Sequence, residues 1–155
     1  MSGADPQTAA SRAHDLLDTT SVVLNGQATS RQAAITEAGQ LLVQAGAVEP
    51  AYVDAMHERE QSVSTHMGNL LAIPHGTSVA KSNIRRTAIS YVHYPKLIDW
   101  DGKPTEFVIG IAGAGDDHLK LLSRIAELFT SSDGVERLRA SATPTHARAT
   151  LLGDA

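Results

Sequence analysis

The order of apolar and polar residues changes period several times along the chain. From position 30 to position 46, apolar residues recur three and four residues apart, at Ala34, Ala38, Leu41, Leu42 and Ala45. This spacing predicts an amphipathic helix with Ser30 as its N-cap and Gly46 as its C-terminal stop. Pro50 favours the first turn of a second helix, and side chains spaced three and four residues apart extend that helix to about Glu60.

Other segments have the composition of β-strands. They are SVVLNG at 21–26, LLAI at 70–73, RTAISYVHY at 86–94 and EFVIGIAG at 106–113. The last is so continuously apolar that it predicts a central strand covered on both faces.

Helical spacing returns in the C-terminal part of the chain. In residues 116–129 the predicted apolar stripe is Leu119, Leu122, Ile125, Ala126 and Phe129. Asp133 with Glu136 resembles a capping box, and Thr143-Pro144 favours the start of a last helix. Because strands and helices alternate, we expect an α/β fold.

Length and composition restrict the class of protein. The 155 residues suit one domain, predicted for 15–155, preceded by a small polar stretch, 1–14, that we expect to be a flexible arm. A net charge of −4 argues against a nucleic-acid partner, and the absence of cysteine excludes thiolate chemistry. Without a signal-like or membrane-spanning run, we expect a cytoplasmic protein that does not insert into a membrane.

Two of the seven histidines have a suggestive setting. His75 follows a predicted strand and lies between Pro74 and Gly76, and His118 begins a helix after the predicted central strand. In α/β proteins sites form at the carboxyl ends of strands, and a neutral imidazole there is able to accept a phosphoryl group. Spacing alone, however, favours a turn or packing residue at 75 and a helix-start residue at 118 over functional roles.

Other motifs give weaker signals. His57, His66 and His75 recur every nine residues, which fits neither a helix face nor the usual zinc spacings, so we predict no metal site. The run GIAGAG is an incomplete dinucleotide motif, so no cofactor is predicted. A solvated basic rim is expected at Lys81, Arg85 and Arg86, where an acidic partner is able to dock.

Two long segments resemble a known family. VEPAYVDAMHEREQSVSTHMGNLLAIPHGT at 48–77 and GIAGAGDDHLKLLSRIAELF at 110–129 resemble the IIA component of the phosphoenolpyruvate-dependent sugar phosphotransferase system, in its mannitol and fructose class. The resemblance extends over residues 17–153, with the RE, IPHG and HL elements in the family's order. It implies a mixed β-sheet flanked by α-helices on both faces.

The resemblance also implies a phosphotransferase with a phosphohistidine intermediate. His75 matches the histidine that accepts phosphate from the histidine-containing phosphocarrier protein and passes it to a cysteine of the IIB domain, for uptake of mannitol or fructose. His118 and Arg59 match the residues that stabilise the phosphate. In this scheme the helix that begins near Asp116 points its positive end at the site, and the carboxylates of Asp116 and Asp117 point away.

The chain departs from the family pattern at one notable position. His66 stands where mannitol-type relatives commonly have an aromatic residue, so we expect it to alter the wall of the site, while Trp100 receives no role. The segment 48–60 favours mannitol over fructose.

One alternative is a nitrogen-type regulatory protein that signals by its phosphorylation state. A second alternative is a metal-dependent hydrolase that uses His66, His75 and His118. The sequence offers no well-spaced carboxylate ligand for such a metal site.

Overall fold

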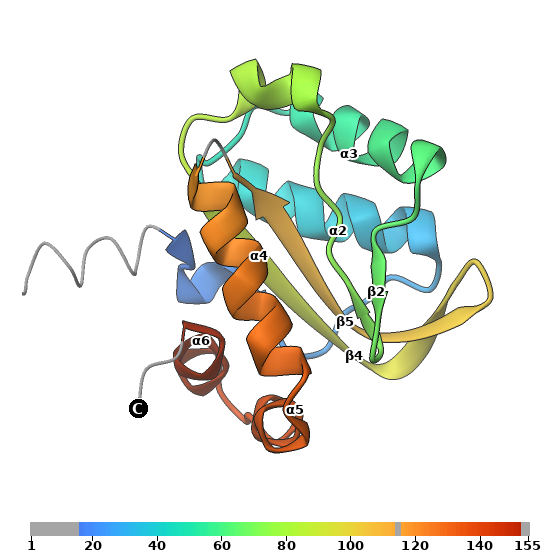
Figure 1. Cartoon of the computed structure of the whole chain (residues 1–155), viewed down its shortest axis with the longest axis vertical. Coiled ribbons are helices and arrows are strands. Elements are labelled where there is room, and N and C mark those ends of the chain that lie inside the picture. The colour runs from blue at the N-terminus through green and yellow to red at the C-terminus, as the bar shows by residue number, and fades with distance from the viewer. Residues whose placement is uncertain (1–15, 114–115, 153–155) are drawn as a thin grey trace, which may run out of the picture.

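A computed structural model of the chain describes residues 16–113 and 116–152, except for the side chains of 116–118. The arm predicted for residues 1–14 therefore lies outside the described residues. Figure 1 shows a sheet between two groups of helices. The α-helices are α2 (Arg31–Gln44), α3 (Ala51–Ser62), α4 (Asp116–Phe129), α5 (Ser132–Arg139) and α6 (Pro144–Leu152). The strands are β1 (Val22–Val23), β2 (His66–Gly68), β3 (Leu71–Ala72), β4 (Ala88–Trp100) and β5 (Lys103–Ala112), and the short 3-10 helices are η1 (Thr19–Ser21) and η2 (Ser78–Asn83).

The sheet is mixed, with strand order β1-β4-β5-β3-β2. β4 pairs with β5 antiparallel, whereas β1 pairs with β4 and β3 pairs with β5 in parallel. β5 is therefore the central strand, as its continuous apolar run predicted. The predicted α/β fold with a mixed sheet is confirmed.

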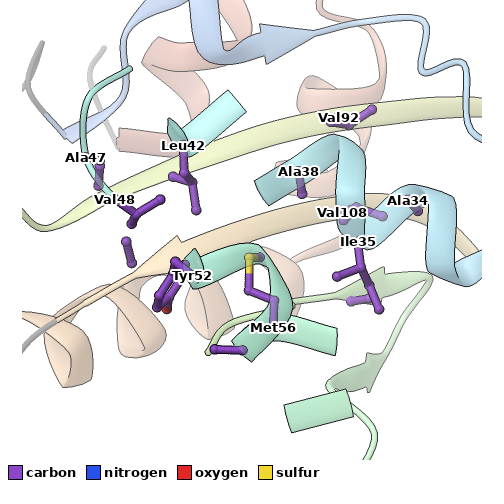
Figure 2. Close-up of a cluster of buried hydrophobic side chains, with 14 of the residues drawn as sticks. Ala34, Ile35, Ala38, Leu42, Ala47, Val48, Tyr52, Met56, Val92 and Val108 are labelled. Atoms are coloured by element: carbon purple, nitrogen blue, oxygen red, sulfur yellow. The ribbon is translucent and has the colours of Figure 1, made fainter. Parts of the chain in front are cut away.

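Each face of the sheet has its own hydrophobic core. Along β5, Val108 and Ala112 belong to the core under α2 and α3, whereas Phe107, Ile109 and Ile111 belong to the core under α4, α5 and α6. Figure 2 shows the first core, in which α2 and α3 side chains pack against Val92 and Val108. This alternation explains why the strand has no polar face.

The first long helix follows its local sequence signals. Ser30 Oγ accepts a hydrogen bond from Ala33 N at 3.1 Å, and Gly46 has φ +75° just beyond the end of α2. Both the predicted N-cap and the predicted stop are confirmed. Thr143 Oγ1 likewise accepts from His146 N at 3.1 Å and caps α6 as predicted.

Two details of the C-terminal helices were predicted wrongly. The N-cap of α5 is Ser131, whose Oγ accepts from Gly134 N at 3.1 Å, because Ser131 has the extended backbone that a cap requires while Asp133 already lies in the helix. The buried face of α4 centres on Leu121, Ile125 and Phe129. Leu119 is 64% exposed, because it lies about 120° around the helix from Ile125. Ala126 of the predicted stripe is exposed as well, because it lies about 100° from Ile125.

β4 extends beyond the predicted segment 86–94. It continues through a bulge after His93 to Trp100 and joins β5 in a tight turn. Asp101 has φ 55° and Gly102 has φ 90°, the positive values that a two-residue hairpin turn of this kind requires.

Among the described residues, no helix is long and apolar enough to cross a bilayer.

Candidate functional site

His75 lies at the carboxyl end of the parallel strands β3 and β5. It follows β3 by a short loop and forms an isolated parallel bridge with Ile111, whose amide donates to Pro74 O at 3.0 Å. His118 lies in the first turn of α4, shortly after β5 ends at Ala112. The chain thus brings both predicted segments to one edge of the sheet, although the His118 side chain lies outside the described residues.

One hydrogen bond fixes the tautomer of His75. Its Nδ1 lies 2.8 Å from Ile73 O, and because a carbonyl oxygen only accepts, Nδ1 must carry the hydrogen. The lone pair of the neutral ring is then on Nε2. Partial burial lowers the pKa of His75, an effect that the nearby Arg59 reinforces and the Ile73 hydrogen bond opposes. The ring is therefore neutral and nucleophilic near pH 7.

His75 opens into a cleft of about 610 Å³. Described residues that line it are Tyr52, Arg59, Gly76, Thr77, Ser78, Lys81, Ile84, Gly113 and Leu119. Arg59 comes from α3 and Lys81 from η2, and none of these lining residues is acidic. A cationic cleft next to a neutral imidazole suits a dianionic phosphoryl group.

Arg59 and Glu60 are neighbours with opposite surroundings. Arg59 lines the cleft, and its Nη1 donates to Val63 O at 2.5 Å. The Glu60 carboxylate is buried and accepts from Thr65 N, from Thr65 Oγ1 and from Trp100 Nε1. Burial raises the pKa of Glu60, but the hydrogen bonds from Thr65 and Trp100 outweigh it and hold the pKa below its usual value. Glu60 is thus an ionised anchor for the loop that follows α3.

Tyr52 is a cleft residue that the sequence did not single out. Its hydroxyl donates to Ile111 O at 2.8 Å and accepts from Gly76 N at 2.9 Å, so it connects β5 to the loop that carries His75. In the sequence, Tyr52 is one of several apolar residues on the buried face of a helix. Nothing in that pattern distinguishes it from an ordinary core residue.

His66 does not form the wall of the cleft, contrary to expectation. It is on the edge strand β2, its Nδ1 accepts from Gly68 N at 3.0 Å, and its Nε2 faces Pro104 O at 3.4 Å. It is absent from the described residues that line the cleft. Within the described part of the chain, no group of three or more histidine and acidic side chains is placed to hold a metal ion.

The expected basic rim is only partly solvated. Arg86 Nη2 donates to Ala45 O at 2.7 Å and so binds the C-terminal end of α2, and Arg85 lies 3.6 Å from Glu49. Lys81 is exposed like Arg85, but it differs from both arginines because it lines the cleft. The predicted carboxylate directions at Asp116 and Asp117 concern side chains outside the described residues.

Comparisons with known proteins agree with this arrangement. The family model described as phosphoenolpyruvate-dependent sugar phosphotransferase system, EIIA 2, matches residues 15–153. A mannitol-specific phosphotransferase enzyme IIA component from Halalkalibacterium halodurans is 47% identical over 123 residues, covering 79% of this chain and 85% of that protein. The chain therefore belongs to the EIIA 2 family of the sugar phosphotransferase system, whose members are phosphotransferases.

Solved structures show the same fold. The IIA protein in a complex of mannitol IIA with phosphorylated mannitol IIB from Escherichia coli matches with a TM-score of 0.80 and 28% identity, over 89% of this chain and 99% of that chain. The nitrogen regulatory protein IIA-Ntr from Neisseria meningitidis matches with a TM-score of 0.72 at 23% identity, over 88% of this chain and 97% of that chain. The second match shows a shared fold alone.

Proposed function

We propose that this chain is the IIA phosphoryl carrier of a mannitol phosphotransferase system and that His75 Nε2 is the acceptor atom. The observation that carries the proposal is the hydrogen bond between His75 Nδ1 and Ile73 O, because it presents the Nε2 lone pair beside a cationic cleft. The donor is the histidine-containing phosphocarrier protein, and the recipient is a IIB cysteine. Transfer between these proteins takes place in the cytoplasm.

The reaction consists of two displacements at phosphorus. The Nε2 lone pair of His75 attacks the phosphorus, the N–P bond of the donor phosphohistidine breaks, and the donor ring keeps the electron pair. A IIB thiolate then attacks the same phosphorus and releases His75 as neutral imidazole. Such transfers need alignment and stabilisation of spreading negative charge more than covalent assistance.

The cleft supplies that stabilisation. Arg59 contributes a planar guanidinium that is well suited to phosphoryl oxygens, and Lys81 contributes a second positive charge. We assign the same role to His118 in the first turn of α4, where the helix end adds partial positive charge. Stabilisation by these groups increases as charge moves onto the phosphoryl oxygens during transfer.

The relatives favour transport over regulation. The curated relative at 47% identity is named mannitol-specific, and the structural match with the higher TM-score is a mannitol IIA bound to phosphorylated IIB. The nitrogen regulatory structure resembles this chain at the level of the fold. Both classes require a phosphorylated histidine, so the transfer to IIB distinguishes them.

Phosphoryl transfer in vitro tests the proposal. Labelled phosphoenolpyruvate, enzyme I and the phosphocarrier protein are incubated with the wild type, with His75→Ala and with His146→Ala, a control that removes an exposed histidine on α6. We expect acid-labile, base-stable label on the wild type and the control, and none on His75→Ala. Mannitol IIB is then expected to remove the label. Label that stays on the wild type in the presence of IIB would favour the regulatory alternative.

A further inference from the structure

Tyr52 fastens the loop that carries His75 to the central strand. Its hydroxyl contacts Ile111 O at 2.8 Å and Gly76 N at 2.9 Å, and the side chain is only 2% exposed. Ile111 also donates to Pro74 O, so the residues on both sides of His75 are bound to the same position of β5. One of these two links is a backbone bond, and the other depends on a single side-chain oxygen.

The ring of Tyr52 restricts the same loop by contact. A Cβ atom built on Gly76 would lie 2.5 Å from Tyr52 Cε1, so the backbone at 76 rests directly on the ring. This close approach explains why glycine follows His75. The ring and the hydroxyl together define the path of the chain from Ile73 to Gly76, and with it the distance from His75 Nδ1 to Ile73 O.

Two other tyrosines show that this arrangement is specific. Tyr91 is fully buried on β4, and its hydroxyl has no hydrogen-bond partner among the described residues, so the side chain contributes packing there. Tyr94 donates to Glu37 at 2.5 Å, away from the residues that line the cleft. Among these three, only the Tyr52 hydroxyl bridges two backbone groups, and both lie next to the proposed acceptor. A phenylalanine would fill the same volume without that bridge.

We infer that Tyr52 is a positioning residue for phosphoryl transfer: its hydroxyl holds the loop in the geometry that keeps hydrogen on His75 Nδ1 and the lone pair on Nε2. This inference rests on the proposed function, because it assigns Tyr52 to the same reaction. Tyr52 touches no reacting atom in this scheme. Loss of its hydroxyl acts through the orientation of His75, and therefore lowers kcat for phosphoryl transfer while leaving KM for the phosphocarrier protein near its wild-type value.

The test compares Tyr52→Phe with Tyr94→Phe and Tyr91→Phe. Tyr94→Phe also removes a partly buried phenol hydrogen bond and so controls for a general loss of stability. Tyr91→Phe controls for loss of a phenol oxygen that has no partner in the described part of the chain. Each variant is assayed for transfer from the phosphocarrier protein, and its thermal unfolding is recorded. Nitrogen-15 NMR of the His75 ring reports the tautomer without any phosphoryl transfer.

We expect Tyr52→Phe to transfer about tenfold more slowly or worse, with a His75 spectrum shifted toward a mixture of tautomers. Tyr94→Phe and Tyr91→Phe should keep the wild-type rate and spectrum. A wild-type rate and an unchanged spectrum in Tyr52→Phe would overturn the inference, as would an equal slowing in Tyr94→Phe. If the wild type accepts no phosphate, the proposed function fails, and the tautomer comparison still decides whether Tyr52 positions the ring.

Discussion

Trp100 Nε1 donates a hydrogen bond to Glu60 Oε2 at 2.9 Å and thereby joins the end of β4 to the end of α3. The same carboxylate accepts from the amide and hydroxyl of Thr65. The loop between α3 and β2 is thus held at Thr65, and it includes Val63, whose carbonyl binds Arg59. A buried tryptophan outside the cleft therefore supports the position of a cleft arginine.

Replacement of Trp100 by phenylalanine should destabilise the protein. Trp100→Phe removes one donor from a buried carboxylate and leaves unfilled volume, and together we expect a loss of about 2–4 kcal/mol in the free energy of unfolding. Urea denaturation measures this loss. Tyr91→Phe, which removes a buried hydroxyl that has no hydrogen-bond partner within residues 16–113 and 119–152, should stay close to the wild type. A Trp100→Phe protein as stable as the wild type would show that the Glu60 contact contributes little.

The sequence predicts those parts of the fold that depend on local signals. The helix from Ser30 to Gly46 is defined by a cap, a stop and its apolar spacing, all within 17 positions. The central strand β5 is evident from its uninterrupted apolar run. The α5 cap was misplaced because Ser131 and Asp133 are both good caps, and only the backbone conformation decides between them.

The parts that sequence did not predict depend on contacts between distant positions. Tyr52 meets Ile111 across 59 positions, and Glu60 meets Trp100 across 40. No spacing rule relates such pairs, so Tyr52 looked like a core residue and Trp100 had no role. His75 was singled out by its position between proline and glycine after a strand and by the family resemblance, whereas its tautomer required the structure.

The pKa of His75 predicts how the protein responds to acid. Burial lowers this pKa below the value of about 6.5 expected in the unfolded chain. Below that value the unfolded chain takes up a proton while the folded ring stays neutral, so the stability due to His75 falls until the pH reaches the folded pKa. NMR titration should therefore place the midpoint of His75 below 6.5. A midpoint above 6.5 would contradict the lowering of the pKa by burial, and a midpoint above 7 would contradict a mostly neutral ring at pH 7.

Removal of the cleft guanidinium should slow phosphoryl transfer. Arg59→Gln withdraws a cation from the site where negative charge increases, and we expect the rate to fall about 100-fold. Arg59→Lys keeps the positive charge but loses the planar guanidinium with its paired N–H donors, and it should have an intermediate rate. Arg85→Gln is the matched control, because Arg85 is exposed and pairs with Glu49. Equal rates for the Arg59 and Arg85 variants would remove Arg59 from the mechanism.

Two glycine substitutions separate stability from activity. Gly76→Ala forces a methyl group against the Tyr52 ring and should cost about 1–3 kcal/mol of stability and slow phosphoryl transfer by displacing the loop. Gly46→Ala meets no neighbouring atom but has φ +75°, so we expect a cost of about 1–2 kcal/mol with normal transfer. Denaturation curves and transfer rates are measured for both. Normal transfer in Gly76→Ala would show that the loop tolerates displacement.

The position of the phosphoryl group on the histidine ring tests the proposed mechanism most directly. Protein labelled with nitrogen-15 in histidine is phosphorylated through enzyme I and the phosphocarrier protein, and phosphorus–nitrogen couplings are measured by NMR. We expect phosphorus bonded to Nε2 of His75, with hydrogen retained on Nδ1. Phosphorus on Nδ1, or on any other residue, would contradict it.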